Sequence, residues 1–515
     1  MKMRGADLLA RTLAAAHVKH VFTLSGNHVM PVFDAALEAK LSLVHVRHEA
    51  AAVHMADAWG RLTGEPGIAL VTGGPGHANA VSALYTALAA ESPLVLISGH
   101  APLGELGKGA FQEMRQAEIA APLCKASWTS RSASGVGKDV ARALSEARSG
   151  RPGPVHLSVP NDVLDALVDA KPPARSAFQA KPAVLDARQA DALLTALAAG
   201  RKPVILAGPA MMHAHGRARQ WRLEEATGVP VIGMESPRGV KDPALGRLAA
   251  VLAEADVVLL FGKRMDFTLG FGRPFAKDAR LLETPADMDA KASCDALVER
   301  AARRKPAKSG WLAEVHAALA YRPPEWASLR SKPEGPLHPA ELSRAVQRLL
   351  DSPEAVLVCD GGEFGQWSQA CLRATHRLIN GPAGSIGSAL PFAAAAKLAF
   401  PASCVVAMLG DGTLGFHLSE IETAVRCKLD YLAIVGNDAC WNAEHQIQLR
   451  AYGAARAHGL DLLPVRYGTV AAAMGAHGED LSRPAELEPA LGRAAKSSRV
   501  SCVNAMIERL AAPSY

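Results

Sequence analysis

The sequence predicts an α/β protein built from doubly wound parallel sheets. Short runs of β-branched and other apolar residues alternate along the chain with longer Ala- and Leu-rich segments of helical period. Buried parallel strands read as continuous apolar runs, and regular alternation of strands and helices is typical of βαβ units. The predicted strands cover residues 68–71, 94–98, 155–159, 204–208, 257–262, 355–360, 404–411 and 431–438.

The length and the Pro-rich breaks predict three domains. The chain has 515 residues, and domains usually contain roughly 100–200 residues. Pro-rich segments form semi-rigid spacers, and three such segments interrupt the strand–helix alternation, at residues 166–186, 303–310 and 321–339. We therefore expect domains at residues 1–168, 184–305 and 338–512.

Composition limits the class of protein. Hydrophobic residues make up 49% and charged residues 21%, which argues against a disordered chain,. The net charge of +6 (56 − 50) is spread thinly, without the basic stripe of a nucleic-acid binder,. The eight cysteines show no close ligand spacing, and no apolar run is long enough to span a membrane,. We expect a cytoplasmic protein with no nucleic-acid or membrane partner.

Two predicted strands near the C-terminal end of the chain run into acidic residues. One ends at Gly410-Asp411-Gly412-Thr413 and the other at Asp438. The acids lie 438 − 411 = 27 positions apart, about one strand–helix–strand step, so neighbouring strands would carry both to one edge of a sheet,. Two carboxylates, a main-chain carbonyl and phosphate oxygens make an all-oxygen site that suits Mg²⁺. Gly410 and Gly412 let the main chain approach a phosphate, and the following helix N-terminus adds N–H donors.

This segment, GDGTLGFHLSEIETAVRCKLDYLAIVGNDACWNAEHQ, resembles the diphosphate-binding motif of thiamine-diphosphate enzymes, and more closely that of the acetolactate synthase and benzaldehyde lyase branch. The resemblance covers nearly the whole chain. It implies a pyrimidine-binding, a central and a diphosphate-binding domain, in that order. It also implies that Asp411, Asp438 and the main-chain carbonyl of Cys440 hold the metal ion, and that Gly412 and Thr413 contact the diphosphate. The family often has Asn where this chain has Asp438, and either residue supplies an oxygen.

Glu49 is the second part of the resemblance. In VRHEAAAVHMADAWGRLTG it stands at a predicted strand-to-helix junction. Taken alone, an acid there is explained by the preference for negative charge in the first turn of a helix. The resemblance instead implies that Glu49 hydrogen-bonds the aminopyrimidine ring of the cofactor. This bond would promote loss of the proton from the reactive carbon of the cofactor. A desolvated carboxylic acid holds the required proton more readily.

Three glycine-containing segments support the same interpretation. In GPAGSIGSALPFAAAA, the resemblance implies that Ile386 wedges under the cofactor and that the carbonyl of Gly384 accepts from its amino group, although Ile386 taken alone also suits an ordinary core. DGGEFGQW (360–367) matches the first diphosphate loop, with main-chain contacts expected from Gly362 and Glu363. GGPGHANAVSAL is a Gly-rich turn that opens a helix in the pyrimidine-binding domain.

The substrate-facing candidates are His28 and Gln112. His28 lies on an early strand-to-helix loop and aligns with a catalytic histidine of benzaldehyde lyase; a loop histidine in a hydrogen-bond network is the competing interpretation. A histidine near its ordinary pKa can shuttle protons to a substrate oxygen. Gln112 falls in a segment that resembles the family's glutamine loop, where an amide holds a carbonyl oxygen. We expect His77, His417 and His445 to be structural or solvent-facing.

The central segment is expected to be a scaffold. Its strands are followed by no GxGxxG, and the FAD-contacting motif of acetolactate synthases is not recognised, so we expect no FAD,. The stretch GKRMDFTLGFGRP also resembles 2-hydroxyacyl-CoA lyases and oxalyl-CoA decarboxylases. The Tyr-Glu pair of those decarboxylases is replaced here by Phe111-Gln112, which counts against their substrate.

The sequence thus predicts a thiamine-diphosphate- and Mg²⁺-dependent carboligase or lyase, acetolactate synthase-like, that acts next to the carbonyl of a 2-oxo acid, an aldehyde or a 2-hydroxy ketone. A 2-oxo acid decarboxylase and a 2-hydroxyacyl-CoA lyase remain as enzymatic alternatives. A cofactor-binding or regulatory protein without turnover is the alternative from another class. Active sites of the family lie between two chains, so the resemblance implies a homodimer or homotetramer.

Overall fold

The computed structural model describes residues 2–180, 182–304 and 310–513. The chain divides into two compact units. Unit 1 comprises Met1–Glu235, Asp256–Arg264 and Asp278–Ser309; unit 2 comprises Ser236–Ala255, Met265–Lys277 and Gly310–Tyr515. Most of the predicted linker at 303–310 lies outside the described residues, and the division into three domains stays a prediction.

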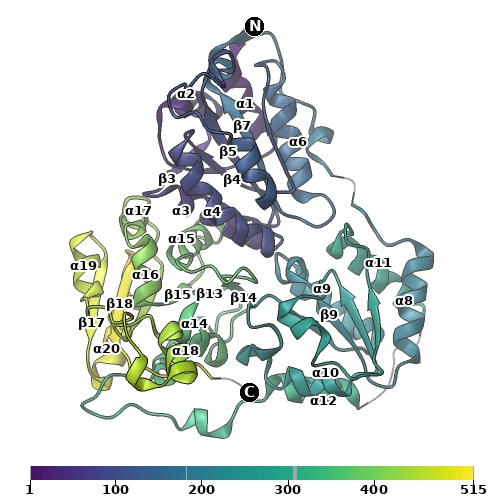
Figure 1. The fold of residues 1–515 in the computed structure, drawn as a ribbon, viewed down its shortest axis with the longest axis vertical. Coiled ribbons are helices and arrows are strands. Elements are labelled where there is room, and N and C mark those ends of the chain that lie inside the picture. The colour runs from purple at the N-terminus through teal and green to yellow at the C-terminus, as the bar shows by residue number, and fades with distance from the viewer. Residues whose placement is uncertain (1, 181, 305–309, 514–515) are drawn as a thin grey trace. The chain divides into compact units, whose positions relative to one another are not determined.

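The α/β fold class is confirmed, because three parallel sheets account for the strands of both units apart from one short antiparallel pair (Figure 1). That pair joins β1 (Met3–Arg4) to β8 (Leu167–Val168). Each of the eight predicted strands overlaps an observed one.

The first sheet of unit 1 has the strand order β3-β2-β4-β5-β7-β6. Its strands are β2 (His20–Thr23), β3 (Ser42–His45), β4 (Gly67–Val71), β5 (Leu94–His100), β6 (Ala126–Thr129) and β7 (Pro154–Pro160). All seven residues of β5 are buried, as a central strand covered on both faces requires,. The helices of this region are α1 (Gly5–Ala15), α2 (Met30–Ala39), α3 (Glu49–Thr63), α4 (Pro75–Ala89), α5 (Gln116–Ala120), α6 (Val136–Arg148) and α7 (Asn161–Asp165).

Helices cover both faces of this sheet. α1, α2 and α6 share one apolar core with the strands, while α3 and α4 pack against each other on the opposite side, as Figure 1 shows. Gly60 allows α3 to approach the chain before β5, because a Cβ there would lie 2.3 Å from the carbonyl oxygen of Pro93. α3 also carries a buried ion pair, in which Arg61 Nη2 lies 2.6 Å from Asp57 Oδ2.

The second sheet of unit 1 has the order β10-β9-β11-β12. Its strands are β9 (Pro203–Ala207), β10 (Val231–Gly233), β11 (Val257–Phe261) and β12 (Arg280–Glu283). A separate apolar core joins this sheet to α8 (Ala187–Ala199), α9 (Gly216–Thr227) and α11 (Ala290–Ala301). The two sheets of unit 1 thus have distinct cores.

The sheet of unit 2 has the order β14-β13-β15-β16-β18-β17, with every pairing parallel. Its strands are β13 (Val356–Cys359), β14 (His376–Ile379), β15 (Val405–Gly410), β16 (Leu432–Asn437), β17 (His477–Leu481) and β18 (Ser501–Met506). The helices of unit 2 are α10 (Leu248–Glu254), α12 (Trp311–Ala320), α13 (Pro339–Val346), α14 (Gly362–Cys371), α15 (Ala389–Ala399), α16 (Asp411–His417), α17 (Glu420–Arg426), α18 (Asn442–Tyr452), α19 (Tyr467–Ala473) and α20 (Leu487–Ala495).

The sheet of unit 2 ends in loops that hold polar residues. Its core is formed by the strands with α13, α14 and α20. The carboxyl ends of β13, β15 and β16 lie side by side, because β15 pairs with both of the others.

Among the described residues, no helix has the length and apolar character needed to cross a lipid bilayer.

Candidate active site

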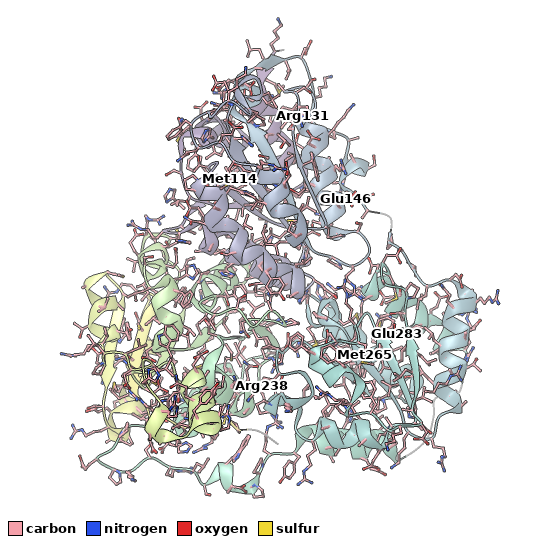
Figure 2. All side chains as sticks on the ribbon, viewed as in Figure 1. Met114, Arg131, Glu146, Arg238, Met265 and Glu283 are labelled. Atoms are coloured by element: carbon pink, nitrogen blue, oxygen red, sulfur yellow. The ribbon has the colours of Figure 1, made fainter. Side chains whose placement is uncertain are left out.

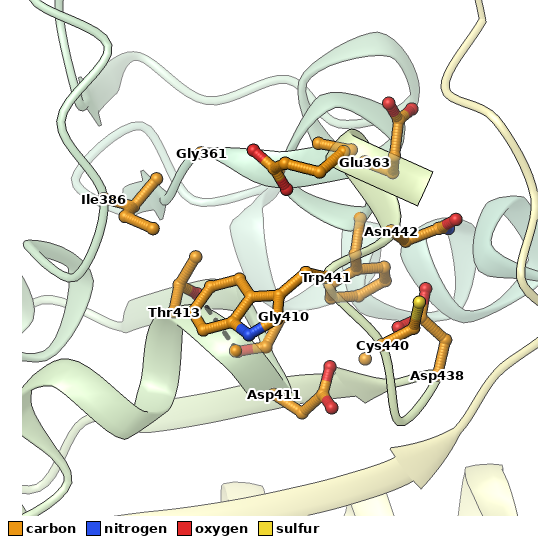
Figure 3. Close-up of a pocket in the computed structure, with 16 residues that line it drawn as sticks. Gly361, Glu363, Ile386, Gly410, Asp411, Thr413, Asp438, Cys440, Trp441 and Asn442 are labelled. Carbon is orange, nitrogen blue, oxygen red and sulfur yellow. Dashed lines mark hydrogen bonds between the residues drawn. The ribbon is translucent and has the colours of Figure 1, made fainter. Parts of the chain in front are cut away.

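The structure brings Asp411 and Asp438 together at one edge of the unit 2 sheet. Asp411 is the first residue of α16 and directly follows β15, while Asp438 directly follows β16. The two strands are hydrogen-bonded neighbours in which Gly410 pairs with Gly436. Both carboxylates line one pocket, shown in Figure 3. The two aspartates therefore lie together at one sheet edge, as their spacing in the sequence predicted.

The electrostatics of the two acids suit a bound cation. Burial raises the pKa of Asp411 to about 6, although main-chain N–H groups partly offset the effect. Burial, together with the neighbouring charge of Asp411, raises the pKa of Asp438 to about 7. Asp411 Oδ2 is buried without a hydrogen-bond partner among the described residues. A divalent cation would relieve both the repulsion and the missing interaction, so the residues present fit Mg²⁺.

Cys440 and Trp441, which come shortly after Asp438 in the chain, line the same pocket. Cys440 is buried and forms an isolated antiparallel bridge with Asp461. Trp441 was not predicted: its ring lies against Gly412, where a Cβ would come within 2.8 Å of the ring (Figure 3). The described residues contain no group of three or more His, Cys, Asp or Glu side chains arranged for a metal ion. Any cation here would therefore need main-chain or phosphate oxygens as well.

Glycines and one isoleucine form the opposite wall of the pocket. Gly361, Gly362 and Glu363 line it at the start of α14, and Gly362 has a φ of 83° that a side chain would strain. Ile386 is partly exposed and lines the pocket, so it is not an ordinary core residue. Gly384, with a φ of 69°, is exposed and does not belong to the pocket lining.

Asp360 is a site residue that the sequence reasoning missed. It is completely buried at the end of β13 and accepts hydrogen bonds from the N–H groups of Gly361, Gly387 and Ala389. Its carboxylate thus joins the loop at residues 360–367 to the segment that carries Ile386. An acid placed between a strand end and a Gly-rich loop was the available signal in the sequence.

Neither His417 nor His445 lines this pocket. His417 is buried, and its Nδ1 lies 2.7 Å from the carbonyl oxygen of Gly387. His445 is partly exposed on α18 and does not line the pocket. His417 therefore has the packing role expected from the sequence. Thr413 lines the pocket, and its hydroxyl donates to the carbonyl of Gly410 at 3.0 Å.

Glu49 begins α3 in unit 1 and is nearly buried, with 9% of its surface exposed. Its Oε2 accepts a hydrogen bond of 3.0 Å from Asn79 Nδ2 on α4. The Gly-rich turn approaches it closely, since a Cβ on Gly76 would lie 3.3 Å from Glu49 Oε1. The turn and the acid thus form one local structure.

His28 and Gln112 belong to neighbouring loops of unit 1. His28 is 2% exposed; its Nδ1 lies 3.2 Å from Thr72 Oγ1, and its ring stacks on Phe111. Burial lowers the pKa of His28, so its neutral form is favoured at physiological pH,. Gln112 has a φ of 55° and packs against Gly74. A Cβ added to Gly74 would lie 2.7 Å from the Cβ of Gln112. Its side chain makes no hydrogen bond to any described residue.

Gln116, which the sequence reasoning also missed, fixes the loop that carries Gln112. Its side chain is fully buried, accepts from the N–H of Gly74 at 2.8 Å and donates to the carbonyl of Gly99 and to Ser158 Oγ. One amide therefore ties the Gly-rich turn and two strand ends to this loop. His77 is buried, with its Nδ1 2.9 Å from Ser98 Oγ, in agreement with a structural role.

Comparisons with known proteins identify the family. The thiamine pyrophosphate enzyme N-terminal TPP-binding domain matches residues 3–119, and the C-terminal TPP-binding domain matches residues 360–505. The chain is 35% identical to the acetolactate synthase large subunit of Mycobacterium tuberculosis, with 98% of this chain and 96% of the relative covered. It is 30% identical to the 2-hydroxyacyl-CoA lyase 2 of Caenorhabditis elegans, over 93% of this chain and 85% of the relative.

The human 2-hydroxyacyl-CoA lyase 2 is 29% identical, over 94% of this chain and 86% of that protein. The matched domains contain Glu49 in one case and Asp411 with Asp438 in the other. The resemblance found in the motifs is therefore confirmed over nearly the full length. The chain belongs to the thiamine pyrophosphate enzymes.

Proposed function

We propose that this enzyme uses Mg²⁺ with thiamine diphosphate to make a carbon–carbon bond next to a carbonyl, as an acetolactate synthase-like carboligase acting on 2-oxo acids. The observation that carries the proposal is the paired, buried Asp411 and Asp438 beside a Gly-rich pocket wall. When bound, thiamine diphosphate supplies a nucleophilic carbon that adds to a carbonyl and then accepts the electron pair released there.

Asp411, Asp438 and the main-chain carbonyl of Cys440 are the proposed metal ligands. Gly362 and Gly412 are proposed to contact the diphosphate through their main chain; a side chain on Gly412 would meet Trp441, and one on Gly362 would strain the main chain. Ile386 offers an apolar surface inside the same pocket. These roles divide the pocket into a charged half for the metal ion and an apolar half for the cofactor ring.

Glu49 is the proposed acid that activates the cofactor. Among the described residues, the hydrogen bond to its carboxylate comes from Asn79 to Oε2 alone, which leaves Oε1 available to a ligand nitrogen. Its place at the start of α3 holds it in one position. The carboxyl group of Glu49 would exchange a proton with that nitrogen, which is the usual task of a positioned acid–base group.

Gln112 and His28 are the proposed substrate-facing residues. The Gln112 amide offers both a donor and an acceptor to a carbonyl oxygen. His28 is held neutral by burial, which suits a proton donor or acceptor rather than a fixed charge,. The apolar Phe111 beside them is 68% exposed and presents a hydrophobic surface next to Gln112.

A 2-hydroxyacyl-CoA lyase activity is the second candidate, because relatives with that name are 28–30% identical to the chain. Product analysis separates the two. With thiamine diphosphate and Mg²⁺ present, acetolactate formed from pyruvate supports the carboligase, and acetaldehyde alone supports a decarboxylase. Aldehyde release from a 2-hydroxyacyl-CoA supports the lyase.

Cofactor binding without turnover of any of these substrates would contradict all three activities and leave a binding or regulatory protein.

We also propose that the enzyme is a cytoplasmic homodimer or homotetramer, with a mass measurable by light scattering. A monomer that retains full activity would contradict that assembly.

A further inference from the structure

The loop between β16 and α18 holds a strained residue at the metal site. Ala439, between Asp438 and Cys440, has a φ of 52°, which is unfavourable for a residue with a side chain,. It is 8% exposed and packed among its neighbours. A strained residue persists only where the surrounding contacts hold it in place. The conformation that presents the two proposed metal ligands must therefore be fixed from outside the loop.

Arg509 supplies contacts that hold this loop. Its Nε donates to the carbonyl of Asp438 and its Nη2 to the carbonyl of Ala439, both at 2.8 Å. Its Nη1 donates to Asp461 Oδ1 at 2.7 Å. Two consecutive carbonyls are thus held by the rigid guanidinium fork, a geometry that a lysine cannot reproduce.

The segment at residues 461–462 pairs with this loop and also contacts Arg509, through Asp461. Cys440 is bridged to Asp461, and the N–H of Leu462 donates to the carbonyl of Ala439 at 2.8 Å. Asp461 itself is 77% exposed, so its ion pair with Arg509 is largely screened by water,. The bonds from Arg509 to the main-chain carbonyls therefore matter more for the loop than the ion pair does.

Arg509 belongs to a segment that is attached to the pocket at several further points. We call Glu508–Pro513 the C-terminal strap. The carbonyl of Leu510 accepts from Asn442 Nδ2 at 3.1 Å, and Glu363 accepts from the N–H of Ala512. The carbonyl of Pro513 accepts from Arg238 Nη1 at 3.3 Å; Figure 2 labels this arginine, and Figure 3 shows Asn442 and Glu363 beside the pocket.

We propose that Arg509 is a positioning residue for the metal site: from the C-terminal strap it holds Asp438–Cys440 in the strained conformation that presents the metal ligands. The proposal deepens the proposed function and rests on the Mg²⁺ site described there. For loss of the Arg509 side chain, the proposal predicts a change in metal affinity opposite in sign to the change expected from its charge alone. A cation beside the two aspartates repels Mg²⁺, so loss of its charge alone would strengthen metal binding, whereas loss of positioning weakens it.

The test measures metal affinity rather than turnover. Mn²⁺ binding to the full-length protein is followed by electron paramagnetic resonance with thiamine diphosphate present, for the wild type, Arg509→Met and Arg509→Lys. Arg509→Met removes charge and donors, while Arg509→Lys keeps the charge and loses the fork. We expect both variants to bind Mn²⁺ at least about tenfold more weakly.

Arg499→Met is the matched control, because Arg499 is exposed in the same unit and, among the described residues, its side chain donates only to the carbonyl of Gly475. Its metal affinity should equal that of the wild type. Unchanged or tighter Mn²⁺ binding by Arg509→Met, or wild-type affinity in Arg509→Lys, would overturn the positioning role. If Arg509→Met does not fold, Arg509→Lys decides the question alone.

The metal site and the role of Arg509 are tested separately. A wild-type protein that binds no divalent cation in the presence of thiamine diphosphate contradicts the proposed metal site and with it the whole function. A wild-type protein that binds the cation, with Arg509 variants that bind it equally well, contradicts only the role of Arg509.

Discussion

Both carboxylate oxygens of Asp360 accept a hydrogen bond from the main-chain N–H of Gly387, at 3.0 and 3.1 Å. The same carboxylate accepts from the N–H of Gly361 at 2.8 Å and from that of Ala389, the first residue of α15, at 3.1 Å. The acid that directly follows β13 therefore caps the start of α15 and fixes the loop before that helix, which carries Ile386.

Asp360→Asn should destabilise unit 2 and loosen the pocket. The amide offers one acceptor oxygen and places an NH₂ group against N–H donors, so at least one buried donor loses its partner, at a cost of roughly 1–3 kcal/mol. Denaturant unfolding measures the loss, and calorimetry should show weaker thiamine diphosphate binding. Glu354→Gln, at an exposed position of the same unit, serves as control. Wild-type stability of Asp360→Asn would contradict the capping role.

The pH dependence of stability should report the protonation of the Asp360 carboxyl group. Burial raises the pKa of Asp360 to about 6, above the value of about 3.9 for an unfolded chain. The native protein therefore retains a proton that the unfolded chain has released, so the contribution of Asp360 is largest below pH 4 and is lost as the pH rises through 6,. The free energy of unfolding of the wild type minus that of Asp360→Asn should fall by about 1–3 kcal/mol across this window. A constant difference would contradict the raised pKa.

Glu49→Gln should lower turnover by roughly 10²–10⁴-fold while the fold stays intact, because the amide cannot exchange the proton that a positioned acid transfers. The variant can keep the hydrogen bond from Asn79, since Gln also offers an oxygen,. Steady-state kinetics with saturating cofactor measure the effect, with the exposed Glu38→Gln as control. Unchanged turnover in Glu49→Gln would rule out the activating role.

Gly361→Ala should weaken cofactor binding about tenfold, equivalent to about 1.4 kcal/mol. The added Cβ would lie 2.7 Å from Ile386 Cγ2 and 3.0 Å from Asn380 Nδ2, so Ile386 must move in the pocket. Gly415→Ala is the matched control, because a Cβ there meets nothing within 4 Å. Calorimetric titration with thiamine diphosphate compares the two; equal affinities would show that the position of Ile386 does not matter for binding.

Arg61→Met should destabilise the protein by about 3–5 kcal/mol, because it leaves the carboxylate of Asp57 buried without its counter-charge. The pair is almost completely inaccessible, with exposed side-chain fractions of 4% and 0%. Replacing both partners by apolar residues should recover much of this loss. The exposed pair Arg303–Glu299 is the control, since its removal should cost less than about 1 kcal/mol,. Denaturant unfolding distinguishes the cases, and similar losses for both pairs would contradict the argument.

The sequence by itself determined the fold class, eight strands of the three parallel sheets and the meeting of Asp411 with Asp438. Central parallel strands are apolar throughout, as in β5, and are therefore visible in the sequence,. The two aspartates follow neighbouring strands one βαβ step apart, so local connectivity alone placed them at one edge. Edge strands such as β3 (Ser42–His45) and β14 (His376–Ile379) were not predicted, because short, partly polar strands carry little signal.

Only the tertiary structure decided how the site is held. Gln116 reaches Gly74, 42 residues away; Asp360 reaches Gly387, 27 residues away; and Arg509 reaches Asp438, 71 residues away. These are side-chain bonds to main-chain groups, which any residue provides, so no pattern of residue types marks the acceptor or donor in advance. Which main-chain group lies within reach depends on the packing of loops across a sheet edge, and that is fixed only when the whole unit folds.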